Sequence, residues 1–319
     1  MKRILLALAM AALATGAAAQ GYPTKPIRLI VPFPGGSTPD TVARTLAQRL
    51  NDAWGQPVVV ENKTGAGGNI GTAEAAKSAP DGYTLVIGIN GPVAVNKALY
   101  KSLPYDPETD LQPISLLAVG AQMLAIHPSV PASNLKEFVE YARKNPGKIS
   151  YGSVGAGSGS HLTMELFKSQ ARIDMVHVPY RGFPPVVHDL LSGNLQATFA
   201  IIPAVLPNVT AGKLKGIAVT SERRSELAPY VPTVAEQGFP RFDATVWIGL
   251  LAPAGLPKDV LDKIAGETQK AMADPEVRRR LGGAGFEVVG GTPEQFATFI
   301  KRETAKWTEV VRLTGAKAD

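Results

Sequence analysis

Pro34-Gly35-Gly36-Ser37-Thr38-Pro39-Asp40 is a glycine-rich stretch that follows a strand-like run at 27–31 and precedes a helix-like run at 41–50. About 120 residues later the arrangement returns in Gly152-Ser153-Val154-Gly155-Ala156-Gly157-Ser158-Gly159-Ser160-His161, again between a strand-like and a helix-like run. A glycine-rich turn from a strand to a helix leaves backbone N–H groups unpaired and aimed at one point, where the positive end of the helix dipole adds to them. The sequence therefore predicts two anion-binding turns that hold one small anion between them.

Strand-like and helix-like runs alternate along the whole chain. The expected strands are 27–31, 58–61, 84–89, 114–119, 123–126, 149–151, 175–178, 197–200, 214–220, 246–252 and 287–289. Helices lie between them, and Thr292-Pro293-Glu294-Gln295 combines an N-cap, a proline in the first turn and a capping-box partner. This alternation predicts α/β layers with mainly parallel sheets. A chain of 319 residues also exceeds what one core usually serves, so we expect two domains.

The first residues are ordered as an export signal, with Lys2 and Arg3, an apolar run at 4–13, and the small residues Ala17-Ala18-Ala19 at a cleavage site. We expect residues 1–19 to be removed, because the apolar run is too short to span a bilayer. The chain has no cysteine, which excludes disulfides, thiolate metal sites and a lipid anchor on cysteine. These observations predict a soluble, unanchored protein of the bacterial periplasm.

Composition and spacing argue against several classes of function. The 33 Lys and Arg residues exceed the 27 Asp and Glu residues only slightly and form no long basic run, which disfavours nucleic-acid binding. Gly65-Ala66-Gly67-Gly68-Asn69-Ile70-Gly71 misses the dinucleotide fingerprint, and no glycine turn has the lysine of a P-loop. The four histidines lack zinc-binding spacing. We therefore expect no cofactor and no metal.

Polar residues at the second turn have more than one interpretation. Ser158 lacks the flanking glycines of a hydrolase nucleophile, so it is either a hydroxyl donor to an anion or an N-cap. His161 opens a helix, where it either lines the site or caps the structure. Arg181 follows a strand and is either a forked partner for a second carboxylate or a solvated surface residue. Tyr180 either contacts a ligand or packs in the core.

Several segments in a fixed order carry a resemblance to a known family. They are Tyr22-Pro23-Thr24-Lys25-Pro26-Ile27-Arg28, Val31-Pro32-Phe33-Pro34-Gly35-Gly36, Val60-Glu61-Asn62-Lys63, Gly65-Ala66-Gly67-Gly68-Asn69-Ile70-Gly71, Ala79-Pro80-Asp81-Gly82-Tyr83-Thr84, Val178-Pro179-Tyr180-Arg181-Gly182, Ala218-Val219-Thr220-Ser221, Pro232-Thr233-Val234-Ala235-Glu236 and Trp247-Ile248-Gly249-Leu250. Nearly end to end, the chain resembles the extracytoplasmic solute-binding proteins of tripartite tricarboxylate transporters, the Bug proteins.

The resemblance implies a two-lobed periplasmic-binding-protein fold of the type II kind, in which each lobe is a mainly parallel sheet flanked by helices and the cleft lies between the lobes. It implies one lobe from 20–124 and 246–319 and a second from 125–245. It also implies a monomer that captures a small organic carboxylate and delivers it to integral-membrane permease subunits. Backbone amides of both turns would clamp the carboxylate.

The matching positions imply ligand contacts from the two turns and from loops that approach the cleft. These positions are Phe33, Gly35, Gly36, Ser37, Asp40, Asn69, Asn90, Ser153, Gly157, Ser158, Gly159, Ser160, His161, Tyr180 and Arg181. Phe183 and Ala200 stand where relatives have other residue types, which predicts a less polar pocket and a preference for an aromatic or otherwise hydrophobic carboxylate over citrate. Two other functions stay open here: a ligand-loaded accessory of a membrane signalling receptor, and a secreted hydrolase.

Overall fold

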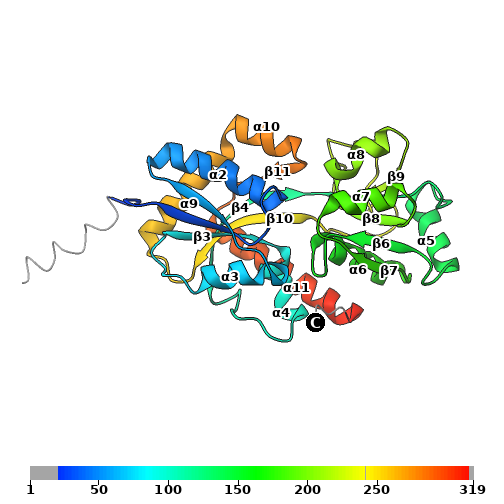
Figure 1. Ribbon diagram of the computed structural model, residues 1–319, viewed down its shortest axis with the longest axis horizontal. Helices are drawn as coiled ribbons and strands as arrows, with labels where there is room; N and C mark the ends of the chain where they lie inside the picture. Colours follow the sequence, from blue (N-terminus) through cyan, green and yellow to red (C-terminus); the bar gives the residue numbers. More distant parts are fainter. Residues whose placement is uncertain (1–20, 241, 316–319) are drawn as a thin grey trace, which may run out of the picture.

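The computed structural model describes residues 21–240 and 242–315, so the expected signal at 1–19 lies outside the described residues. Two sheets lie side by side, each with helices around it (Figure 1). The six-stranded sheet contains β1 (Ile27–Val31), β2 (Val58–Asn62), β3 (Thr84–Ile89), β4 (Leu111–Gly120), β10 (Val246–Pro253) and β11 (Phe286–Val288). The five-stranded sheet contains β5 (Gln122–Ile126), β6 (Ser150–Ser153), β7 (Val176–Pro179), β8 (Ala197–Ile201) and β9 (Lys215–Val219).

We call the six-stranded sheet with its helices the first lobe and the five-stranded sheet with its helices the second lobe. The helices of the first lobe are α2 (Thr38–Trp54), the short η1 (Ala66–Gly68), α3 (Asn69–Ala76), η2 (Gly91–Val95), α4 (Asn96–Leu99), α9 (Lys258–Ala273), α10 (Pro275–Gly283) and α11 (Pro293–Thr314). Those of the second lobe are α5 (Leu135–Lys144), α6 (Gly159–Ala171), α7 (Phe183–Leu191) and α8 (Ile202–Thr210). The expected two-lobed α/β fold is confirmed.

The strand order is β11-β4-β10-β3-β1-β2 in the first lobe and β7-β6-β8-β5-β9 in the second. Within the described residues, β1 is parallel to β2 and β3, and β6 is parallel to β7 and β8. β10 and β5 are antiparallel to both of their neighbours, so each sheet is mixed although most of its strands run in one direction. These exceptions arise where the chain changes lobe, because only residue 121 separates β4 from β5 and β10 returns the chain to the first sheet.

The alternation of side chains along β1 shows how the sequence builds the layers of the first lobe. Leu29 and Val31 belong to one buried cluster with residues of α2, α9 and α10, whereas Ile30 belongs to another with residues of α3 and α11. Successive side chains of a strand point to opposite faces, so an uninterrupted apolar strand needs helices on both sides. The capping box predicted at Thr292 and Gln295 is confirmed at the start of α11.

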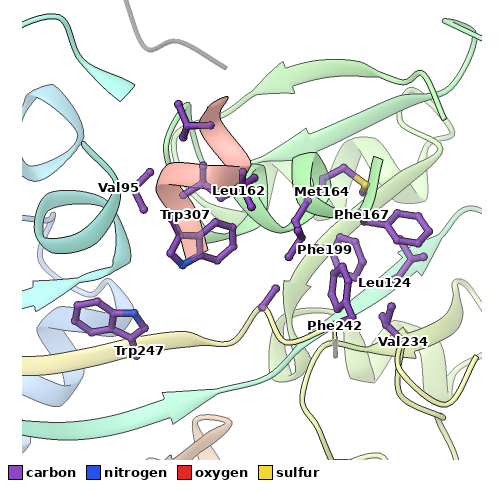
Figure 2. Packing of buried hydrophobic residues seen from close by; sticks show 14 of the residues in the cluster. Val95, Leu124, Leu162, Met164, Phe167, Phe199, Val234, Phe242, Trp247 and Trp307 are labelled. Carbon is purple, nitrogen blue, oxygen red and sulfur yellow. The ribbon is translucent and has the colours of Figure 1, made fainter. Parts of the chain in front are cut away.

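A buried polar contact anchors the C-terminal helix α11 to strand β10 of the first lobe. Trp247 on β10 and Trp307 on α11 are almost fully buried in the same hydrophobic cluster (Figure 2). Both indole N–H groups donate to Oε2 of the buried Glu303, at 3.2 Å and 3.0 Å, while Lys306 Nζ lies 2.6 Å from its other oxygen. α11 also packs against α6 of the second lobe, so one carboxylate anchors the helix that the lobes share.

We expect Glu303→Ala to lower the free energy of unfolding by about 3 kcal/mol, because it leaves two buried indole donors and a lysine without their acceptor. Urea denaturation followed by tryptophan fluorescence measures the change. Glu309→Ala is the matched control on the same helix, since its pair with Arg312 is exposed and screened by solvent and contributes little to stability. Equal losses in the two variants would contradict the proposed anchor.

Candidate functional site

The first glycine turn ends at the N-terminus of α2. Gly36 has φ +77°, and Ser37 is the N-cap residue with extended backbone angles. The Gly36 N–H donates to Oδ2 of Asp40 at 2.8 Å, one helical turn into α2. Gly35 lies next to Asn62, and the Phe33 carbonyl accepts from Asn62 Nδ2 at 2.9 Å. The side chains of Asp40 and of Asn62 on β2 thus hold the turn in place.

Asp40 is a buried acceptor inside the first turn. Besides Gly36, it accepts from Arg44 Nε at 2.9 Å and from Asn62 Nδ2 at 2.9 Å. Burial by itself raises the pKa of the Asp40 carboxyl, but the hydrogen bonds from Arg44, Asn62 and Gly36 outweigh burial and hold the pKa below its usual range. Asp40 therefore stays ionised near neutral pH, and its charge is matched by Arg44.

The second glycine turn ends in the same way at the N-terminus of α6. Gly157 has φ +73°, and Ser158 is an N-cap residue with extended backbone angles. A Cβ on Gly157 would lie 2.8 Å from Leu99 Cδ2, and one on Gly159 would lie 2.5 Å from Val246 Cγ1. Leu99 and Val246 belong to the first lobe, so the second turn points across the boundary between the lobes.

The backbone amides of the second turn are mostly occupied. Four of them donate within the turn: Val154 to Ser160 Oγ at 3.1 Å, Gly155 to Ser153 Oγ at 3.1 Å, Gly157 to His161 Nδ1 at 3.2 Å, and Ser158 to the Gly155 carbonyl at 3.2 Å. The expectation that these amides are unpaired is therefore wrong. The physical reason is that the serine and histidine side chains of the turn fold back onto their own backbone. Ser158 Oγ also caps the His161 N–H at 3.4 Å.

Beneath the second turn lies a stack of rings that sequence reasoning missed. His161 stacks on His177 with centroids 4.1 Å apart, and His177 stacks on Tyr151 at 5.0 Å. His177 Nε2 is also 2.6 Å from Ser153 Oγ. The signal that could have found His177 is the parallel pairing of β6 with β7, which sets it beside Tyr151.

The titratable groups of this cluster favour neutral imidazoles. Burial lowers the pKa of His161, against the opposing effect of Glu165. Burial and the neighbouring His161 lower the pKa of His177 to about 4. Glu165 accepts from Tyr151 Oη at 2.6 Å and from Lys168 Nζ at 2.7 Å, and those bonds outweigh burial to hold the pKa of Glu165 below its usual range. The charges near the stack thus pair with each other.

The predicted site residues Asn69 and Asn90 are both buried and hydrogen-bonded to other residues. Asn69 is buried, and its Oδ1 accepts from Asn96 and Tyr105. Asn90 is also buried, and its Oδ1 accepts from the Trp247 N–H at 3.1 Å, which ties the end of β3 to the start of β10. Both asparagines are therefore occupied inside the first lobe.

Tyr180 and Arg181 follow β7 next to the second turn. The Tyr180 hydroxyl donates to Asp189 Oδ2 at 2.6 Å, and its backbone N–H donates to the Ser153 carbonyl at 2.9 Å. The Arg181 side chain is exposed and has no hydrogen bond or ion pair with any other residue that the structure describes. The Tyr180 hydroxyl is therefore already engaged, whereas the charge of Arg181 remains available to a ligand.

A cavity of about 150 Å³ lies at the first turn, between the lobes. It is lined by Gly36, Thr38, Thr41, Val42, Ala284 and Phe286 of the first lobe and by Ile201 of the second. Ser37 Oγ, between two of these lining residues in sequence, is buried without a hydrogen-bond partner among the described residues. The small volume, below that of pockets for drug-sized ligands, suits a compact metabolite.

Two further features separate this cavity from alternatives. A larger hollow of about 450 Å³ lies over α4 and the loop after it, but only the first lobe lines it, and its Lys97 is paired with Asp106 and Glu108. Ala200 is fully buried in the core of the second lobe, so the expectation that it lines the pocket is wrong. The next residue, Ile201, lines it instead, while Phe183 packs against the same core.

The described ranges, 21–240 and 242–315, contain neither a metal-ligand cluster nor a membrane-spanning helix. No group of three or more His, Asp or Glu side chains there is arranged to hold a metal ion. No helix there combines the length and the apolar character needed to cross a membrane.

Residues 42–315 match the family model for the tripartite tricarboxylate transporter family receptor. The chain belongs to this family. BugT of Bordetella pertussis is 38% identical over 97% of this chain and 95% of its own length. A solved structure titled as that of a periplasmic transporter is 44% identical, covers 93% of this chain and 100% of its own, and superposes with a TM-score of 0.83. R. palustris Rpa4515, solved with adipate, is 33% identical with a TM-score of 0.83, over 92% of this chain and 98% of its own.

This membership decides one of the alternatives left open by the sequence, the secreted hydrolase. The protein is a binding protein of a transport-receptor family and is not an enzyme. Its fold is that of the periplasmic binding proteins it superposes on. The secreted-hydrolase alternative is therefore wrong, in agreement with Ser158, whose hydroxyl is occupied by the Gly155 carbonyl at 2.6 Å.

We expect the stability of the protein to fall as the pH drops from about 6.5, the usual histidine pKa, to about 4, the pKa of His177 in the folded state. The folded state keeps His177 neutral, so the unfolded state binds the extra proton over this range. His177→Gln keeps a side-chain partner for Ser153 but does not titrate. Urea denaturation at several pH values should show a shallower loss for His177→Gln than for the wild type, whereas parallel curves would contradict this assignment.

Proposed function

We propose that this protein captures a small organic carboxylate in the periplasm and delivers it to the membrane subunits of a tripartite transporter. The cavity between the lobes carries the proposal, because it places the N-terminus of a 17-residue helix beside apolar side chains of the first lobe and Ile201 of the second. The family, the adipate found in the R. palustris relative and the export-like first residues agree with it.

The carboxylate is placed at the N-terminus of α2. The first N–H groups of a helix have no intrahelical acceptor, and the helix dipole favours a negative charge there. Thr38 supplies such an amide, and Ser37 Oγ is an unused donor beside it. Each hydrogen bond to a charged group contributes about 1.5–3 kcal/mol, so these contacts suffice for a modest affinity before the ordering costs.

The rest of the ligand faces an apolar wall on one side and the second glycine turn with Arg181 on the other. Val42, Ala284, Phe286 and Ile201 form an apolar wall, which favours a ligand with a hydrocarbon body over a highly hydroxylated one. We place the second contact of the clamp at the second turn, where the N-terminus of α6 lies at the boundary with the first lobe. Arg181 supplies an unpaired cation for a second carboxylate.

Closure of the lobes completes the site. The cavity needs Ile201 from the second lobe, so it exists only when the lobes are close together. Closing expels water and strengthens each contact between a donor and the carboxylate. Membrane subunits can then distinguish the loaded, closed form from the open one, as in other hinge-closing proteins.

We expect Gly36→Asp to weaken adipate binding at least about tenfold more than Gly36→Asn does. A Cβ at Gly36 meets no atom within 4 Å, and Asn and Asp tolerate its positive φ best among other residues, so both variants keep the fold. Only the aspartate adds a negative charge near the ligand, which costs about 1–4 kcal/mol at 4 Å. Isothermal titration calorimetry measures the affinities. Equal affinities in the two variants would show that no anion binds at this turn.

We expect Ile201→Ser to weaken adipate binding about fivefold to thirtyfold, because a side chain of the apolar wall is lost. Binding of malate, a shorter and hydroxylated dicarboxylate, should change less. Competition of both acids in a thermal-shift assay measures the ratio. If the substitution weakens both acids equally, the apolar wall does not select the ligand.

A further inference from the structure

The two glycine turns share one backbone arrangement, with corresponding residues 121 positions apart. The glycines have φ +77° and +73°, and the following N-cap serines have ψ 164° and 159°. In both turns the serine N–H donates to the carbonyl three residues earlier at 3.2 Å, and the serine carbonyl accepts the first helical hydrogen bond at 2.9 Å. The turn is therefore the same local structure built once in each lobe.

Both turns also contain a hydrogen bond from the glycine N–H to a side chain in the first turn of the following helix. The glycine N–H donates to the side chain four residues later, to Asp40 Oδ2 at 2.8 Å in the first lobe and to His161 Nδ1 at 3.2 Å in the second. In an ordinary capping box, the third helical residue reaches back to the N-cap N–H. Here the N-cap N–H already has a carbonyl acceptor, so the same helical position reaches one residue further back, to the glycine.

This contact serves the turn rather than the helix. The glycine precedes the N-cap, so its N–H is not among the donors that the start of a helix leaves unpaired. Capturing that N–H inside the turn fixes the direction of the chain before the helix. The first helical residues, Thr38 and Gly159, lie at the boundary between the lobes, because Thr38 lines the cavity and a Cβ on Gly159 would lie 2.5 Å from Val246 Cγ1.

Asp40 and His161 accept the glycine N–H in different charge states. Asp40 accepts as a carboxylate and is matched by Arg44 and Asn62. His161 accepts through Nδ1, and a backbone N–H can only donate, so the imidazole must be neutral with its proton on Nε2. The stack with His177 and the burial of His161 favour the same neutral form.

We propose that Asp40 and His161 are equivalent positioning residues, one in each lobe, and that each holds its glycine turn in the shape that receives the ligand. They act through the Gly36 and Gly157 amides rather than by touching the ligand. The statement about the ligand rests on the proposed function, whereas the statement about the two amides does not.

Variants of His161 test the proposal. The amide oxygen of His161→Asn occupies the place of Nδ1, that of His161→Gln occupies the place of Nε2, and His161→Leu has no acceptor. Hydrogen exchange of the Gly157 amide, measured by NMR, should speed up roughly tenfold in the Leu and Gln variants, as expected for one lost hydrogen bond. The Asn variant should restore most of the protection. The Gly36 amide of the other lobe is the internal control and should not change.

Adipate titration of the same four proteins provides the second measurement. Affinity should fall about tenfold in His161→Leu and His161→Gln and recover in His161→Asn, in parallel with Gly157 protection. Unchanged protection in the Leu and Gln variants, or no recovery in the Asn variant, overturns the positioning role. If His161→Leu does not fold, the comparison of Asn with Gln decides the question alone. A wild type that binds no carboxylate while the exchange pattern holds would overturn the proposed function and leave the positioning role intact.

Discussion

The N–H groups that begin a helix have no acceptor within it, and the proposed ligand site depends on where two such helix ends lie. α2 and α6 each start directly after a strand and a glycine turn, and each turn faces the other lobe. The first turn shares a cavity with Ile201 of the second lobe, while the second lies against Leu99 and Val246 of the first. Each glycine turn thus lies beside residues of the other lobe.

The electrostatics of the two turns keep this edge attractive to anions. A carboxylate at the start of a helix would ordinarily compete with an anionic ligand, but the charge of Asp40 is matched by Arg44. In the second turn the acceptor is a neutral imidazole, and the nearby Glu165 is paired with Lys168. Neither turn contains an unmatched negative charge. The partial positive charge at both helix ends is therefore not neutralised by the protein and can attract an anionic ligand.

The connection between the lobes explains how a cavity shared by two lobes can form. The chain passes from one sheet to the other through a single residue between β4 and β5 and returns through β10, which pairs with both β3 and β4. α11 also packs against α6 of the second lobe, while its Glu303 accepts from Trp247 and Trp307 inside the first lobe. Strands that continue through a boundary allow small rotations about few residues, which is the geometry of hinge closure.

Local patterns in the sequence were enough to predict the layers, the helix starts and the two glycine turns. A capping box such as Thr292 and Gln295 spans four residues, and the faces of β1 alternate residue by residue, so both can be read without the fold. The turns were also located correctly, although their amides were wrongly expected to be unpaired. The serine and histidine side chains that take those amides have several rotamers, and only packing selects one.

Contacts between distant segments were decided by the tertiary structure alone. His177 meets Ser153 because β6 and β7 pair in one register, Ile201 reaches the cavity because β8 ends at the boundary between the lobes, and Ala200 turns into the core because neighbouring residues of a strand alternate. The amino-acid sequence by itself located the two short segments at which we propose that an anion binds. Which of their donors remain free, and which apolar side chains face them, depends on how two sheets pack, since hydrogen bonds and burial there join residues far apart in the chain.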